Sequence, residues 1–73
     1  MKNIIEEAMA VFMNELDKIV VIRNDAYAKA VNAAWRGDVV DYNKWCKKVQ
    51  ECNARQIELN NELNQINAVY AAI

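Results

Sequence analysis

The stretch AWRGDVVDY, residues 34–42, decides the fold because it contains the only glycine of a 73-residue chain that has no proline. A glycine just past the end of a helix stops it by adopting a left-handed backbone, and an aspartate is a preferred N-cap for the next helix. Asp38 follows Gly37 directly, and the charge of Asp41 favours the free N–H groups of a first helical turn. A single helix through the whole chain would carry Gly37 in its interior at a cost of ~1 kcal/mol. We therefore expect two helices joined by a turn at 36–38.

The turn residues Arg36, Gly37 and Asp38 also spell the tripeptide that adhesion ligands present to integrins. An adhesion function needs an extracellular protein, but the N-terminus lacks a signal-peptide pattern. The longest run of large aliphatic residues covers only 19–22, whereas a membrane span needs about 20 residues. Cys46 and Cys52 would lie about 9 Å apart along one helix, too far for a disulfide. We expect a cytoplasmic protein with free thiols, the alternative being a disulfide between two copies, and we interpret Gly37 as a turn residue.

Apolar residues after the turn recur at alternating intervals of three and four, which is the heptad pattern of a coiled-coil seam. Gln56 is the one amide among them. The pattern predicts a helix over 39–72. The seam residues are Tyr42, Trp45, Val49, Cys52, Gln56, Leu59, Leu63, Ile66, Tyr70 and Ile73.

The first half carries a matching seam, interrupted only by Arg23, and predicts a helix over 3–35. Asn24 and Asp25 could cap a new helix and give three helices in all, but the apolar spacing passes through them without a shift. The expected fold is thus a single all-α domain over 1–73, an antiparallel, coiled-coil-like helical hairpin. The seam residues are Ile5, Met9, Phe12, Leu16, Ile19, Arg23, Ala26, Ala30 and Ala33.

Beside each seam runs a second row without charges, where an isolated coiled coil would place Glu or Lys. We name the two rows together the uncharged face: Met13, Val20, Tyr27 and Ala34 on the first helix, with Cys46, Asn53, Asn60 and Asn67 on the second. Two helices of this length make a thin core, so we expect two hairpins to pair as a homodimeric four-helix bundle. The alternative is that a different chain completes the bundle. The residues expected in the core and in self-association are Met9, Phe12, Met13, Leu16, Ile19, Val20, Tyr27, Trp45, Val49, Leu59, Leu63 and Ile66.

The charges are distributed unevenly along the expected hairpin. Residues 1–17 and 56–73 carry one basic and six acidic side chains, a net −5, whereas residues 18–55 carry eight basic and four acidic ones, a net +4. The end with the termini is therefore acidic, and the end with the turn is basic. An antiparallel twofold dimer would place each acidic end against a basic one.

The composition offers no set of residues for catalysis. The chain has no His, Ser or Thr, which removes the commonest general base and the hydroxyl nucleophiles other than Tyr. Without His or a Cys-x-x-Cys pair, a zinc site is not expected either. We expect no enzyme activity, no cofactor and no metal.

The leading expectation is a protein-interaction module, a small regulator, adaptor or inhibitor of a larger protein, as small phage and mobile-element proteins often are. The alternatives are a nucleic-acid-binding regulator that uses the basic turn end, or a structural subunit of a larger helical complex. Arg23 is open to two interpretations, control of helix register or contact with a partner's carboxylate. The candidate partner-binding residues are Arg23, Lys29, Trp35, Arg36, Lys44, Lys47 and Lys48.

Overall fold

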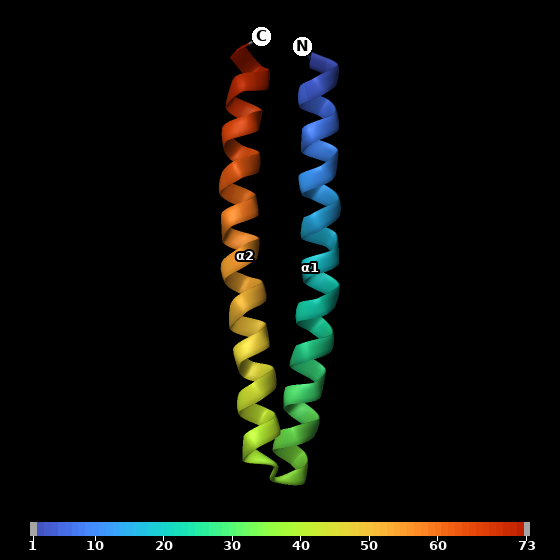
Figure 1. The fold of residues 1–73 in the computed structure, drawn as a ribbon, viewed down its shortest axis with the longest axis vertical. Coiled ribbons are helices and arrows are strands. Elements are labelled where there is room, and N and C mark those ends of the chain that lie inside the picture. Colours follow the sequence, from blue (N-terminus) through green and yellow to red (C-terminus); the bar gives the residue numbers. More distant parts are fainter. Residues whose placement is uncertain (1, 73) are drawn as a thin grey trace.

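A computed structural model describes residues 2–72, which form two helices, α1 (Lys2–Arg36) and α2 (Val39–Ala72), lying antiparallel side by side (Figure 1). The start of α1 and the end of α2 lie together at one end of a rod of 55 × 15 × 11 Å, and the turn forms the other end. This confirms the all-α prediction and the packing of two helices against each other. The structure places the ends of α1 one residue outside the expected range of 3–35, and α1 runs through Asn24 and Asp25 without a break.

Gly37 ends α1 and Asp38 begins α2, as the sequence predicts. Gly37 has a φ of +72°, the left-handed conformation that glycine adopts at little cost. Its N–H donates to the carbonyl of Ala34 at 3.1 Å, and the N–H of Asp38 donates to that of Ala33 at 2.9 Å, which is the Schellman arrangement. The Asp38 side chain then accepts a hydrogen bond at 3.0 Å from the N–H of Asp41 and caps α2. Two residues thus end one helix and begin the next.

The predicted seams lie between the two helices. Every buried hydrophobic residue among those described belongs to a seam: Ala26, Ala30, Ala33, Cys52 and Leu59. The other described seam residues are half-buried, except Tyr42, which stays 41% exposed in the first turn of α2. Ile73, the last residue of the second seam, lies outside the described residues. The core is therefore a single line of contacts, and each helix has one covered side.

The two polar interruptions of the seams meet each other. The guanidinium of Arg23 donates to the side-chain oxygen of Gln56 at 2.8 Å, in a half-buried position. Among the described residues, no buried side-chain nitrogen or oxygen lacks a hydrogen-bond partner. The polar pair is thus accommodated within an otherwise apolar interface.

Neither helix, over the described residues, has a stretch apolar and long enough to cross a lipid bilayer.

Candidate functional site

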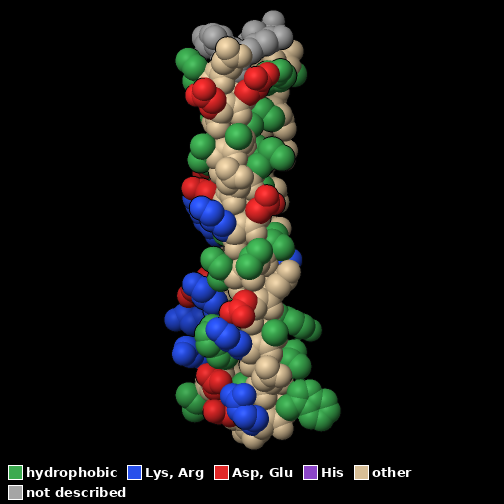
Figure 2. All heavy atoms as spheres, turned by 90° about the vertical axis from the view of Figure 1, so that its right-hand side faces the viewer, with side chains coloured by type: hydrophobic (Ala, Val, Ile, Leu, Met, Phe, Trp, Pro, Cys, Tyr) green, Lys and Arg blue, Asp and Glu red, His purple; other side chains and the backbone are tan. Residues whose placement is uncertain are grey.

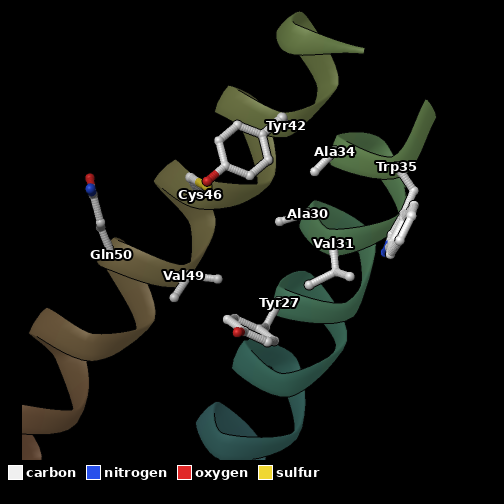
Figure 3. Close-up of a pocket in the computed structure, with 9 residues that line it drawn as sticks. All are labelled: Tyr27, Ala30, Val31, Ala34, Trp35, Tyr42, Cys46, Val49 and Gln50. Atoms are coloured by element: carbon white, nitrogen blue, oxygen red, sulfur yellow. The ribbon is translucent and has the colours of Figure 1, made fainter. Parts of the chain in front are cut away.

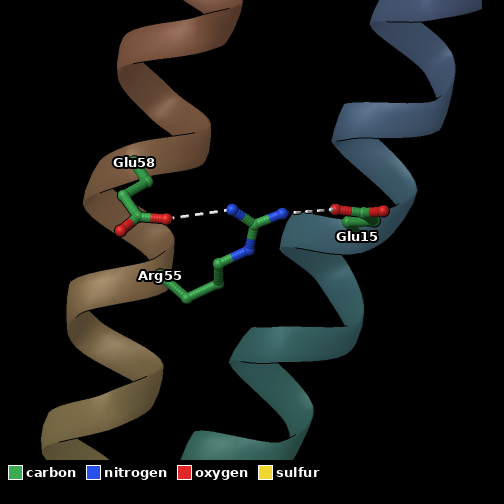
Figure 4. Close-up of polar contacts among 3 residues, drawn as sticks. All are labelled: Glu15, Arg55 and Glu58. Carbon is green, nitrogen blue, oxygen red and sulfur yellow. Dashed lines mark hydrogen bonds and ion pairs between the residues drawn. The ribbon is translucent and has the colours of Figure 1, made fainter.

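The two long faces of the hairpin differ in charge. On the charged face, Arg55 of α2 pairs with Glu58 at 2.9 Å and reaches Glu15 of α1 at 3.5 Å (Figure 4). The hydrogen bond to Glu58, with the nearby charge of Glu15, raises the pKa of Arg55 above its ordinary value. Near the turn, Arg36 pairs with Asp41 at 2.9 Å. Two of these exposed ion pairs, Arg55–Glu15 and Arg36–Asp41, connect α1 and α2 along one side of the seam.

The basic turn end is largely occupied by contacts within the chain. Lys29 pairs with Asp25 at 3.0 Å, and its ammonium group also lies 4.5 Å from the ring centre of Trp45. The ammonium group of Lys44 lies 4.8 Å from the same ring. Trp45 is half-buried, so its ring serves as a cation–π partner for two lysines rather than as a free surface for stacking a base.

The other candidate residues of this end lie at the surface. Lys47 and Lys48 are exposed on α2, and Trp35 is 86% exposed on α1. Figure 3 shows the Trp35 ring pointing away from α2. Figure 2 shows basic side chains gathered along one edge of the turn-end half and hydrophobic ones along the opposite edge. The structure therefore does not bring the two tryptophans together beside the lysines.

The uncharged face contains a hollow at the turn end, with a volume of about 630 Å³ (Figure 3). It forms because Ala30 and Ala34 of α1 have short side chains, while Tyr42 and Val49 stand opposite on α2. The Tyr42 hydroxyl is directed at the Cys46 sulfur, and this contact with the thiol is the main cause that raises the pKa of Tyr42 above its ordinary value. The hollow contains no charged side chain. Its lining residues are Tyr27, Ala30, Val31, Ala34, Trp35, Tyr42, Cys46, Val49 and Gln50.

On α1, two of the three large residues of the uncharged face are exposed to solvent. Met13 is 55% exposed and Tyr27 is 63% exposed, while Val20 between them is half-buried. On α2, the amides of Asn53, Asn60 and Asn67 are all exposed. An uncharged surface thus runs along most of the hairpin without a cover in the single chain.

At the acidic end, the row on α1 reaches Glu6, one heptad before Met13. The Tyr70 hydroxyl donates to the Glu6 carboxylate at 2.9 Å, and this bond raises the pKa of Tyr70 above its ordinary value. This carboxylate is therefore held by the neighbouring helix.

Sequence reasoning missed part of the hollow. Val31 and Gln50 line it but were expected neither in the seams nor on the uncharged face. The sequence did contain a signal for this hollow. The apolar residues Tyr27, Val31, Ala34 and Trp35 follow the pattern i, i+4, i+7, i+8, which places them on one side of a helix, next to the seam.

A second hollow of about 450 Å³ lies at the opposite end, on the side of the seam that carries the ion pairs. Its apolar lining comes mostly from side chains near the two termini. The lining residues are Ile4, Ile5, Ala8, Phe12, Glu62, Gln65, Ile66 and Val69. It is smaller than the hollow at the turn, and its lining includes the charged residue Glu62.

Among the described residues, no group of three or more His, Cys, Asp or Glu side chains is placed to hold a metal ion. The uncharged face, with its hollow, combines exposed apolar side chains with a lining that contains no charged residue, and it is the candidate site of this hairpin. Comparison of the chain with protein-family models, with curated proteins and with solved structures finds no match.

Proposed function

We propose that this chain is a non-enzymatic protein-interaction module, a small regulator, adaptor or inhibitor of a larger protein, that works as a homodimer. The dimer forms when two hairpins pack their uncharged faces together into a four-helix bundle. The observation that carries this proposal is the uncharged row on α1, in which Met13 and Tyr27 are exposed and Val20 between them is half-buried. Exposed apolar side chains on one face favour burial against a partner.

The size of the surface supports the proposal. A face of the rod, 55 Å long and 15 Å wide, has an outline of about 800 Å². This is room enough for an interface of ordinary size, in which each partner buries about 800 Å² of accessible surface. Burying this face would also give each helix a second covered side. The thin single-seam core would then become the interior of a bundle.

The test is the solution mass, measured by light scattering after size exclusion at several concentrations in reducing buffer. We expect a mass near twice 8.4 kDa. The variant Met13→Glu places a charge on the uncharged face and should shift the chain to the monomer. A folded wild-type monomer at all concentrations would contradict the proposal.

The matched control is Val11→Glu, which introduces the same charge two residues away on α1. Val11 is 58% exposed, close to Met13, but two residues of helix turn its side chain by about 200°, away from the uncharged face. This variant should keep the dimer mass. If both variants dissociated the dimer equally, the interface would not be the uncharged face.

A further inference from the structure

We infer that the second copy docks antiparallel, with α1 against the partner's α1 and α2 against the partner's α2. In this arrangement Val20 lies at the twofold axis against the partner's Val20, and Met13 faces the partner's Tyr27. The inference rests on the proposed self-association and specifies which part of the partner covers each part of the face.

The spacing of the uncharged face fits this symmetry on both helices. On α1, positions 13 and 27 are equally far from 20, so an antiparallel neighbour brings them opposite each other. On α2, Asn53 and Asn60 are related in the same way about a centre between 56 and 57. The two centres have to lie at the same height of the rod for a single axis to serve both helices.

The contacts between the helices indicate that the two centres lie at about the same height. Glu6 reaches Tyr70, and Arg23 reaches Gln56. Continuing these pairings along the antiparallel helices places Val20 level with residue 56 or 59 of α2, and the Arg36–Asp41 pair places it level with 57. The Glu15–Arg55 pair, which a long arginine side chain makes at 3.5 Å, places it level with 50, so the average lies close to the centre between 56 and 57. One twofold axis can therefore pass through both centres.

The antiparallel arrangement also matches side chains by kind. Met13, Val20 and Tyr27 meet the same apolar row of the partner, while asparagine amides meet asparagine amides, which are able to donate and accept hydrogen bonds mutually. A parallel twofold dimer would instead place α1 against the partner's α2. The apolar row would then cover Asn53 and Asn60 and leave buried amides without partners, which is costly.

The position of the hollow and the distribution of charge also favour the antiparallel arrangement. The hollow extends over residues 27–35 of α1, so the antiparallel partner covers it with its residues 5–13. In that segment the exposed Met13 comes opposite Tyr27, and its unbranched side chain is suited to filling an irregular hollow, while Glu6, which accepts a hydrogen bond from Tyr70, comes opposite Ala34. The same placement lays the half with net charge −5 against the half with net charge +4, whereas a parallel dimer superposes like charges.

Disulfide trapping tests the arrangement on the full chain. Cys46→Ser removes the thiol that lines the face, and the buried Cys52 is kept. In this background Val20→Cys should form a covalent dimer on oxidation, seen on a non-reducing gel. Met13→Cys is the matched control, because it lies 14 residues, or about 21 Å, along the axis from its own copy and should not link alone.

Mixing Met13→Cys with Tyr27→Cys, after the subunits exchange, should restore a covalent dimer between the two variants. A dimer by light scattering in which Val20→Cys fails to link would overturn the antiparallel arrangement. Linking of Val20→Cys chains to Asn53→Cys or to Asn60→Cys chains would show the parallel one. A wild-type monomer would instead overturn the proposed self-association, so the two failures are distinguishable.

Discussion

At the scale of single residues, the pairing of Arg23 with Gln56 explains why each seam contains one polar interruption. The two side chains lie at the same height and share a 2.8 Å hydrogen bond in a half-buried position. A shift of one helix along the other would move each of them against apolar neighbours and leave its polar atoms without a partner. The pair therefore favours one alignment of α1 and α2.

Replacing one member of this pair should cost more than replacing both. Gln56→Leu leaves the Arg23 guanidinium without its acceptor, and we expect a loss of about 1–3 kcal/mol in the free energy of unfolding. The double variant with Arg23→Leu should recover a large part of that loss. Urea unfolding of both single variants and the double variant, at one protein concentration, gives the coupling energy. Simple additivity of the two losses would contradict the role of the pair.

At the scale of the elements, the turn depends on the backbone of Gly37 rather than on space around it. No atom outside its neighbours lies within 4 Å of where a Cβ would be, so a larger residue meets no steric obstacle. Its φ of +72° is the constraint, because L-residues with a Cβ adopt this conformation at a cost. The turn geometry therefore selects the residue type through conformation alone.

Gly37→Ala should destabilise the hairpin by roughly 1–2 kcal/mol, since alanine has to adopt the left-handed conformation. Gly37→Asn should cost less, because asparagine tolerates this conformation better. The urea midpoints of the two variants and the wild type provide the measurement. Equal midpoints for alanine and glycine would mean that the turn does not use the left-handed backbone in solution.

The elements also show which parts of the fold the sequence determines. Heptad spacing and the Gly37–Asp38 pair predicted the all-α fold and the packing of two helices, because both signals are local or periodic. The hollow was not predicted, because it depends on how Tyr42 and Val49 stand across from Ala30 and Ala34 once the helices are aligned. The two lysines over Trp45 likewise depend on the conformations of long, flexible side chains, which no sequence interval specifies.

At the scale of the whole molecule, the hairpin is a rod with opposite charges at its two ends. The acidic half and the basic half differ by nine elementary charges, −5 against +4, within a length of 55 Å. Part of the basic charge is balanced within the chain by exposed ion pairs such as Lys29–Asp25 and Arg36–Asp41, which contribute little to stability by themselves. The uneven charge distribution affects the relative orientation of two rods more than it affects the stability of one. An antiparallel pair places opposite charges together at each end, whereas a parallel pair places like charges together.

Salt should therefore weaken the proposed antiparallel dimer. Raising NaCl from 0.05 to 0.5 M shortens the screening length from about 14 Å to about 4 Å and removes most of the attraction between opposite ends, so we expect a several-fold rise in the dimer Kd by sedimentation equilibrium. The double variant Lys47→Gln and Lys48→Gln lowers the basic half to a net +2 through two exposed side chains and should flatten this dependence. A parallel dimer would respond in the opposite direction, because salt would relieve the repulsion between its superposed like ends, and its Kd would fall.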